Sequence, residues 1–181
     1  MALQEGVESV KNSFSAKKVA LGGILGALTI ICLFLATTLP TNRISLYALS
    51  SFFVSIIVLE AGIGTAWLFY GASSILALLI IPNKVGVIPY IVFFGIYGVI
   101  KFYIEKIGRL VPEWIIKLLY FNICFFAAVH FMKELLNINV IANFPWWAVV
   151  LVFELIYIVY DYVYTLFIGY YKHKIRPKLK W

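Results

Sequence analysis

The sequence is poor in charged residues. Asp, Glu, Lys and Arg make up only 13% of its 181 residues, whereas 64% are hydrophobic. A soluble globular domain has about 25% charged and about 45–50% apolar residues. A chain of this length cannot bury such an excess of apolar side chains in one water-soluble core. The scarcity of charge therefore excludes an ordinary soluble domain and indicates an integral membrane protein.

Cysteines and catalytic motifs are also scarce. Cys32 and Cys124 both lie in apolar stretches, and neither belongs to a CxxC pair. Such cysteines are typical of inert buried thiols, which argues against redox chemistry of the quinone-coupled kind. The chain has no HExxH, GxSxG or phosphate-binding loop motif. We therefore expect no enzyme activity, no cofactor, no metal site and no ATP binding.

Apolar runs of membrane length fill most of the chain. A bilayer core about 30 Å thick requires about 20 apolar residues per helix. Six runs close to this length are separated by short connections rich in polar residues, proline or glycine. We expect helices over residues 19–39, 44–59, 65–81, 85–105, 114–136 and 146–171. The sequence thus predicts an all-α integral membrane protein with a bundle of six transmembrane helices.

This pattern divides the chain into three segments. Residues 1–18 form a polar N-terminal segment, either a short interfacial helix or disordered, and residues 19–171 form the six-helix domain. Residues 172–181 form a basic tail. The net charge of +7 is explained by membrane topology and by attraction to anionic lipid, so we expect no nucleic-acid partner.

The basic residues predict the orientation. Cytoplasmic segments of membrane proteins carry an excess of Lys and Arg. If the N-terminus is cytoplasmic, only Arg43, Lys84 and Lys133 of the fifteen basic residues fall on the outer side. The other twelve are Lys11, Lys17, Lys18, Lys101, Lys106, Arg109, Lys117, Lys172, Lys174, Arg176, Lys178 and Lys180. Both termini are therefore predicted to be cytoplasmic.

Two acidic residues, Glu154 and Asp161, lie inside the last apolar run. A carboxylate at membrane depth costs several kcal/mol unless it is paired, protonated or hydrated. The two residues are seven positions apart and therefore share one helix face. Each is either a ligand-binding or proton-linked acid, or a structural acid paired with tyrosine hydroxyls or a cation. Both interpretations stay open for Glu154, and the structural one is favoured for Asp161.

Several polar residues are expected at the same depth as Glu154 in the outer half of the bilayer. They are Asn42, Arg43, Asn83, Lys84, His130, Lys133 and Glu134. Together with Asn122 in the fifth run, they predict an outward-facing polar pocket for a small-molecule substrate. The alternatives are that Arg43 and Lys84 extend to the outer headgroups, that Asn122 makes a packing hydrogen bond, and that His130 is structural.

Small residues line one face of the first run near its cytoplasmic end. Ala20, Gly23 and Ala27 are spaced by three and four positions, so they fall on one side of a helix. Small side chains at this spacing let a second transmembrane helix approach closely. We therefore interpret this face as a candidate docking surface for a partner.

The sequence resembles the substrate-binding S components of energy-coupling factor (ECF) transporters. The run KKVALGGILGALTIICLFLATTLP is similar to the first helix of an S component, with its small residues and proline-bearing exit. The run LEAGIGTAWLFYGASSILALLIIP is similar to the turn after the second helix and to the third helix. The six-helix topology with both ends in the cytoplasm also resembles that family.

This resemblance implies a function in the bacterial plasma membrane. It implies a subunit that binds a vitamin or related micronutrient from outside and then topples in the membrane. A transmembrane subunit with two ATPases would dock on Ala20, Gly23 and Ala27, and Glu154 would line the substrate pocket. Two alternatives are a non-transporting assembly, envelope or regulatory protein with structural acids, and a small-solute carrier that uses Glu154 as its proton site.

Overall fold

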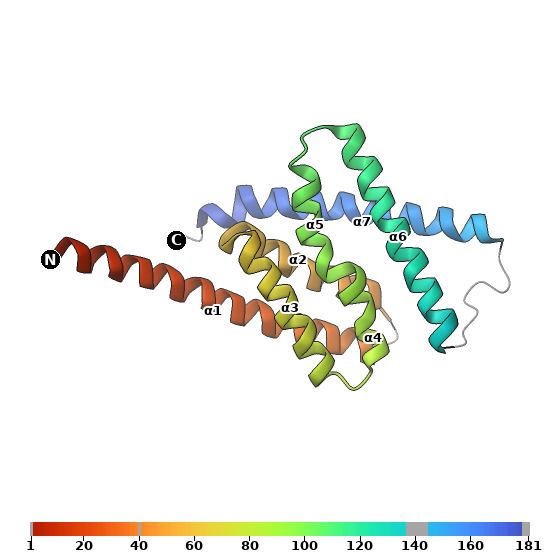
Figure 1. Cartoon of the computed structure of the whole chain (residues 1–181), viewed down its shortest axis with the longest axis horizontal. Coiled ribbons are helices and arrows are strands. Elements are labelled where there is room, and N and C mark those ends of the chain that lie inside the picture. The colour runs from red at the N-terminus through yellow and green to blue at the C-terminus, as the bar shows by residue number, and fades with distance from the viewer. Residues whose placement is uncertain (1, 40, 137–144, 179–181) are drawn as a thin grey trace.

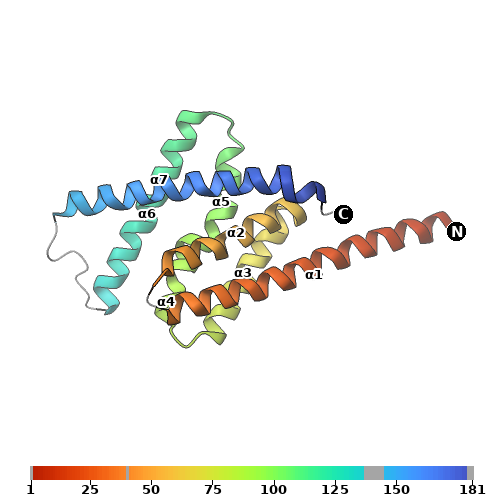
Figure 2. The same ribbon diagram turned by 180° about the vertical axis from the view of Figure 1, so that it is seen from behind.

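The structure is a computed structural model that describes residues 2–39, 41–136 and 145–178, with side chains described for 16–39, 41–130, 145 and 147–178. Every regular element in this part of the chain is helical (Figures 1 and 2). The elements are α1 (Ala2–Thr38), α2 (Arg43–Ala61), α3 (Ile63–Ile80), α4 (Lys84–Pro89), η1 (Tyr90–Phe94), α5 (Gly95–Glu105), α6 (Leu110–Leu136), α7 (Trp146–Tyr170), η2 (Tyr171–Ile175) and η3 (Arg176–Lys178).

Within the described residues, six helical stretches are long and apolar enough to cross a membrane, which confirms the predicted all-α multi-pass membrane protein. They are Ala16–Thr38, Arg43–Ala61, Ile63–Ile80, Lys84–Glu105, Leu110–His130 and Trp147–Lys178. Their outward faces carry large apolar side chains; Val19, Leu68 and Leu79, for example, are 73%, 75% and 75% exposed. Side chains of this kind are stable in contact with lipid tails rather than with water.

The first helix begins much earlier than the predicted position 19. α1 has 37 residues, which at 1.5 Å per residue is about 55 Å, well beyond the bilayer core. The polar segment 1–18 is therefore neither a separate interfacial helix nor disordered from residue 2 onward, because its backbone continues into the first span. The predicted stop at Pro40 lies outside the described residues, and α1 ends at Thr38.

The second and third helices form a tight hairpin. Gly62 joins them with φ of 90°, a backbone angle that favours glycine, and its N–H donates to the carbonyl of Ile57. The hairpin lets α2 extend to 19 residues, longer than the predicted 44–59. The tail after α7 packs on this hairpin, where Arg176 Nε lies 3.3 Å from Glu60 Oε1. At least one basic residue of the predicted tail is therefore paired within the protein.

The fourth span departs from the regular helix predicted for residues 85–105. Pro89 is the last residue of α4 rather than part of the first turn, and a π-helical segment, η1, follows it. Proline has no N–H to donate and its ring crowds the preceding turn, so the helix widens locally. Hydroxyls from other helices bind carbonyls of this segment: Tyr70 Oη donates to Ile91 at 2.6 Å, and Tyr47 Oη donates to Gly86.

The interior contains tyrosine as well as aliphatic side chains. Two buried clusters of mainly aliphatic residues pack α1, α2 and α3 against the fourth span. A third cluster, formed by Tyr97, Tyr157 and Tyr164, joins α5 to α7. Because buried tyrosine hydroxyls require hydrogen-bond partners, this third cluster draws polar groups into the bundle.

The bundle has two distinct ends, which we name for use below. The loop end carries the connections 39–42 and 81–83, and the tail end carries Gly62, the connection 106–109 and the η2–η3 tail. α1 begins and η3 ends on the same side of the molecule (Figure 1). α7 crosses α5 and α6 in both views (Figures 1 and 2).

Gly98 on α5 lies in close contact with α7 and α2, and its replacement tests this packing. A Cβ there would lie 2.6 Å from Tyr164 Oη and 3.4 Å from the backbone nitrogen of Ser55. Tyr164 donates to the carbonyl of Ser51, so it cannot move away freely. We expect Gly98→Ala to destabilise the protein by about 1–3 kcal/mol, measured by thermal unfolding in detergent.

Gly71→Ala is the matched control, because a Cβ at Gly71 would meet nothing within 4 Å. It should leave the unfolding temperature unchanged or raise it, since alanine favours a helix by about 0.5–1 kcal/mol over glycine. Equal effects of the two substitutions on the unfolding temperature would show that Gly98 is not tightly packed against Tyr164 and Ser55.

Candidate functional site

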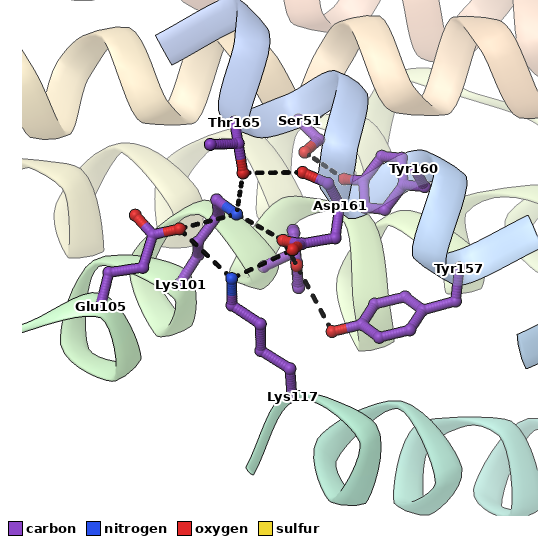
Figure 3. A network of polar contacts seen from close by, with 9 residues as sticks. Ser51, Lys101, Glu105, Lys117, Tyr157, Tyr160, Asp161 and Thr165 are labelled. Carbon is purple, nitrogen blue, oxygen red and sulfur yellow. Dashed lines mark hydrogen bonds and ion pairs between the residues drawn. The ribbon is translucent and has the colours of Figure 1, made fainter. Parts of the chain in front are cut away.

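Asp161 is the centre of a buried polar network between α5, α6 and α7 (Figure 3). Its side chain is almost fully buried. One carboxylate oxygen accepts hydrogen bonds from Lys101 Nζ and Tyr97 Oη, and the other accepts one from Lys117 Nζ at 3.0 Å. Lys101 and Lys117 are themselves 0% and 5% exposed. A carboxylate and two ammonium groups are thus enclosed within the bundle.

Glu105 completes the network. Its Oε1 lies 2.8 Å from Lys101 Nζ and 3.3 Å from Lys117 Nζ. We call Lys101, Glu105, Lys117 and Asp161 the tetrad. It contains two cations and two carboxylates, so its formal charges cancel. Buried ions persist in proteins when they are paired and hydrogen-bonded, and the tetrad meets this requirement from three helices.

The local sequence explains how the tetrad forms. Lys101 and Glu105 are four positions apart on α5, so their side chains meet on one face. Thr165, one turn after Asp161, donates to the Asp161 carbonyl at 2.9 Å and accepts from Lys101 Nζ at 2.8 Å. Lys101 therefore has three oxygen partners, the number that an ammonium group can bind.

The tetrad bears on one count made from the sequence. Lys101 and Lys117 belong to the twelve basic residues assigned to the cytoplasmic side, and both are buried and paired. Without them, ten basic residues remain against three, so the predicted orientation does not depend on them. The contacts of Asp161 are those that its structural interpretation predicts. The four-residue spacing of Lys101 and Glu105 could also have indicated that these two side chains pair.

A layer of tyrosines extends from the tetrad toward the loop end. Tyr97 Oη, which binds Asp161, lies 3.3 Å from Tyr157 Oη. Tyr160 Oη lies 2.7 Å from Ser51 Oγ on α2 (Figure 3). The hydroxyls of this layer are therefore used by side chains inside the bundle, and the rings of Tyr157 and Tyr160 form part of a cavity.

This cavity has a volume of about 260 Å³ and lies between the start of α2, the α4–η1 segment, α6 and α7. It is lined by Ile44, Val85, Ile88, Pro89, Val92, Phe93, Phe94, Phe121, Cys124, Phe125, Ala128, Phe153, Ile156, Tyr157 and Tyr160. Ile44 and Val85 directly follow the connections at the loop end, so the cavity lies on that side of the tyrosine layer. Ligand pockets in proteins are commonly apolar and aromatic in this way.

None of the predicted pocket residues with described side chains lines this cavity. They are Asn42, Arg43, Asn83, Lys84, Asn122, His130 and Glu154, and the side chains of Lys133 and Glu134 lie outside the described part of the structure. Arg43 Nε donates to the carbonyl of Leu39 at 3.2 Å, and Lys84 Nζ donates to the carbonyl of Leu78. Each cation thus caps carbonyls at the end of the preceding helix, where positive charge is favoured.

The structure brings two of the predicted residues together. Asn122 Nδ2 lies 3.2 Å from Glu154 Oε1 and 2.9 Å from the carbonyl of Leu118. Asn42 precedes α2 with φ of 68°, and His130 is exposed on α6. The predicted convergence of these residues at one pocket is therefore not seen among the described side chains. A binding role for Glu154 or Asn122 stays a prediction.

The small-residue face of α1 is open. Ala20, Gly23 and Ala27 are all exposed, and a Cβ at Gly23 would meet nothing within 4 Å. No other helix of the described chain packs closely on Gly23. A helix of a partner therefore has room to approach this face, as its interpretation as a docking surface requires.

Comparisons with known proteins give no relative. No protein-family model, curated protein or solved structure matches this chain. Among the described residues, no group of three or more His, Cys, Asp and Glu side chains is placed to hold a metal ion. The cavity, the tetrad and the open face of α1 are therefore the features on which a function can be argued.

Replacing Asp161 tests the tetrad. Asp161→Asn keeps the shape of the side chain but leaves Lys101 and Lys117 with Glu105 as their only carboxylate. Breaking a buried ion pair by removing one partner costs about 3–5 kcal/mol. We expect a loss of this size in the free energy of unfolding, together with a lower thermal midpoint in detergent.

Glu105→Gln is the matched control, because the Glu105 side chain is 35% exposed, against 4% for Asp161. A partly exposed carboxylate contributes less to an ion pair than a buried one, so this substitution should cost less than half as much. If Asp161→Asn were no worse than Glu105→Gln, Asp161 would not be the centre of the network.

Proposed function

We propose that this protein is a membrane-embedded binding subunit that holds a small molecule in the cavity between α2, α4–η1, α6 and α7. It acts by binding rather than by catalysis, and it serves an importer of the kind that the sequence resembles. The observation that carries this proposal is the cavity itself, an apolar space of about 260 Å³ lined by aromatic and aliphatic side chains from four segments of the chain.

The shape of this space supports a bound molecule. Ile44, Phe153 and Ile156 in its lining are 59%, 40% and 44% exposed, whereas Tyr157 is buried. The cavity therefore opens at the surface of the bundle and reaches inward to the tyrosine layer, so a ligand has a path into it. Concave apolar spaces of this kind are typical of ligand sites.

The tetrad supports a binding role because of where it lies. It joins α5, α6 and α7 toward the tail end, whereas the cavity lies on the loop side of the tyrosine layer. Lys117 on the tail-end half of α6 binds Asp161, while Phe121, Phe125 and Ala128 on its other half line the cavity. We infer that the tetrad holds this wall of the cavity in position.

The orientation and the partners belong to the same proposal. With both termini in the cytoplasm, the cavity lies toward the outside and the tetrad toward the inside. The exposed face of Ala20, Gly23 and Ala27 then lies in the inner half, where a transmembrane subunit with two ATPases would dock. The basic tail would contact anionic lipid of a bacterial plasma membrane.

A retained ligand is the direct test of binding. We expect the protein purified gently from its own membrane to carry a molecule of low mass at about one copy per chain, because the cavity has the volume of one small ligand. Native mass spectrometry gives the stoichiometry, and the denatured extract gives the mass. If the protein carries no such molecule and shows no saturable binding of any small molecule, the binding function is wrong.

Docking is tested at Gly23. Gly23→Leu should reduce co-purification of the transmembrane partner and its ATPases at least tenfold, because a large side chain prevents close helix approach. The thermal midpoint should not change, since a Cβ at Gly23 meets nothing within 4 Å.

Gly169→Leu on α7 is the matched control, because a Cβ there also meets nothing within 4 Å. It should leave the partners bound. Loss of partners in both variants, or in neither, would contradict docking on α1. A protein that keeps its ligand but never co-purifies with ATPases would instead be a non-transporting assembly, envelope or regulatory protein.

A further inference from the structure

We propose that the cavity takes an uncharged molecule with a flat aromatic system of one or two rings. This inference rests on the proposed binding function and names its ligand class. It differs from the expectation drawn from the sequence, in which Glu154 and surrounding cations bind a polar substrate. Three properties of the lining carry it, namely its rings, its lack of charge and its volume.

The rings of the lining form a continuous aromatic group. Seven of the fifteen lining residues are Phe or Tyr, contributed by η1, α6 and α7. Phe93 contacts six other aromatic rings at centroid distances of 5.1 to 6.0 Å. Phe121 and Tyr157 stack at 4.5 Å with an interplanar angle of 12°. A flat ring placed beside them gains about 0.5–1.5 kcal/mol per ring pair beyond its area burial.

The lining offers nothing to pair with a charge, since it contains no Asp, Glu, Lys, Arg or His. The polar groups it does contain are occupied within the bundle. Tyr160 Oη lies 2.7 Å from Ser51 Oγ, and Tyr157 Oη lies 3.3 Å from Tyr97 Oη. The tetrad beyond them is already neutral and paired. An anion would therefore lose its hydration without compensation, at a cost of several kcal/mol. A cation would gain about 0.5–2 kcal/mol from the aromatic faces, which is less than that cost.

The volume limits the ligand to one or two rings. An engineered apolar cavity of about 150 Å³ holds a single benzene. The cavity here, at about 260 Å³, is less than twice as large and lies just below the usual range of about 300–1,000 Å³ for ligand pockets. A fused bicyclic ring with few substituents fits this volume. An acyl chain of a lipid is also apolar and uncharged, but it gains nothing from stacking, so the test includes it.

The test uses indole, an uncharged two-ring compound, as its probe. Protein in lipid nanodiscs is titrated with indole by calorimetry, and empty nanodiscs serve as the blank. We expect saturable binding at one molecule per chain. Tryptamine, which is cationic, and indole-3-acetate, which is anionic, should bind at least tenfold more weakly, as should 1-octanol, which models an acyl chain. Equal binding of a charged analogue or of octanol, or no saturable indole binding, would overturn the inference.

A filled cavity provides the variant test. Ala128 lines the cavity, whereas its neighbour Ala127 does not and is exposed. Ala128→Leu should weaken indole binding at least tenfold without lowering the thermal midpoint, and Ala127→Leu should leave binding unchanged. Equal indole affinity in both variants would place the probe outside the cavity. A retained ligand that proves to be charged would refute this inference while the proposed binding function stands; absence of any ligand would refute both.

Discussion

The pairing of Asp161 with Lys101 and Lys117 is the interaction on which the arrangement of the last three spans depends. Lys101 on α5 and Lys117 on α6 both bind the Asp161 carboxylate on α7, and Glu105 neutralises the remaining positive charge. None of these groups is stable alone in an apolar interior. The helices that carry them are therefore held at fixed depth and rotation relative to one another. That constraint fixes the tail-end half of the bundle and leaves the cavity on its other side.

The tyrosines separate these two environments because each has an apolar ring and a polar end. Tyr157 and Tyr160 present their rings to the cavity, while their hydroxyls bind Tyr97 and Ser51. The rings of these side chains thus complete the apolar lining of the cavity, and their hydroxyls lie within hydrogen-bonding distance of polar groups on the other side. This division explains how a charged network and an uncharged cavity lie close together in one bundle without polar groups lining the cavity.

The sequence predicted the features that depend on local pattern. Run length and hydropathy were sufficient for six helical spans, and the buried setting of Asp161 pointed to an ionic or tyrosine partner. The identity of that partner depended on which faces of α5 and α6 turn inward, which no single segment reveals. The carbonyl contacts of Arg43 and Lys84 were not predicted for a related reason, since they depend on how the chain turns after the preceding helix. The apolar cavity was not predicted because its lining comes from four separate segments.

The π-helical segment after Pro89 has a consequence for the register of the fourth span. A π-helical turn accommodates one more residue than the α-helical turn it replaces, and each α-helical residue turns the chain by about 100°. Residues before η1 line the cavity, and Lys101 after it binds Asp161. Removing one residue from Tyr90–Phe94 would restore a regular helix and rotate Lys101 away from the carboxylate. A change of one residue in the length of the fourth span would therefore decide whether the cavity and the ion pairs can both form.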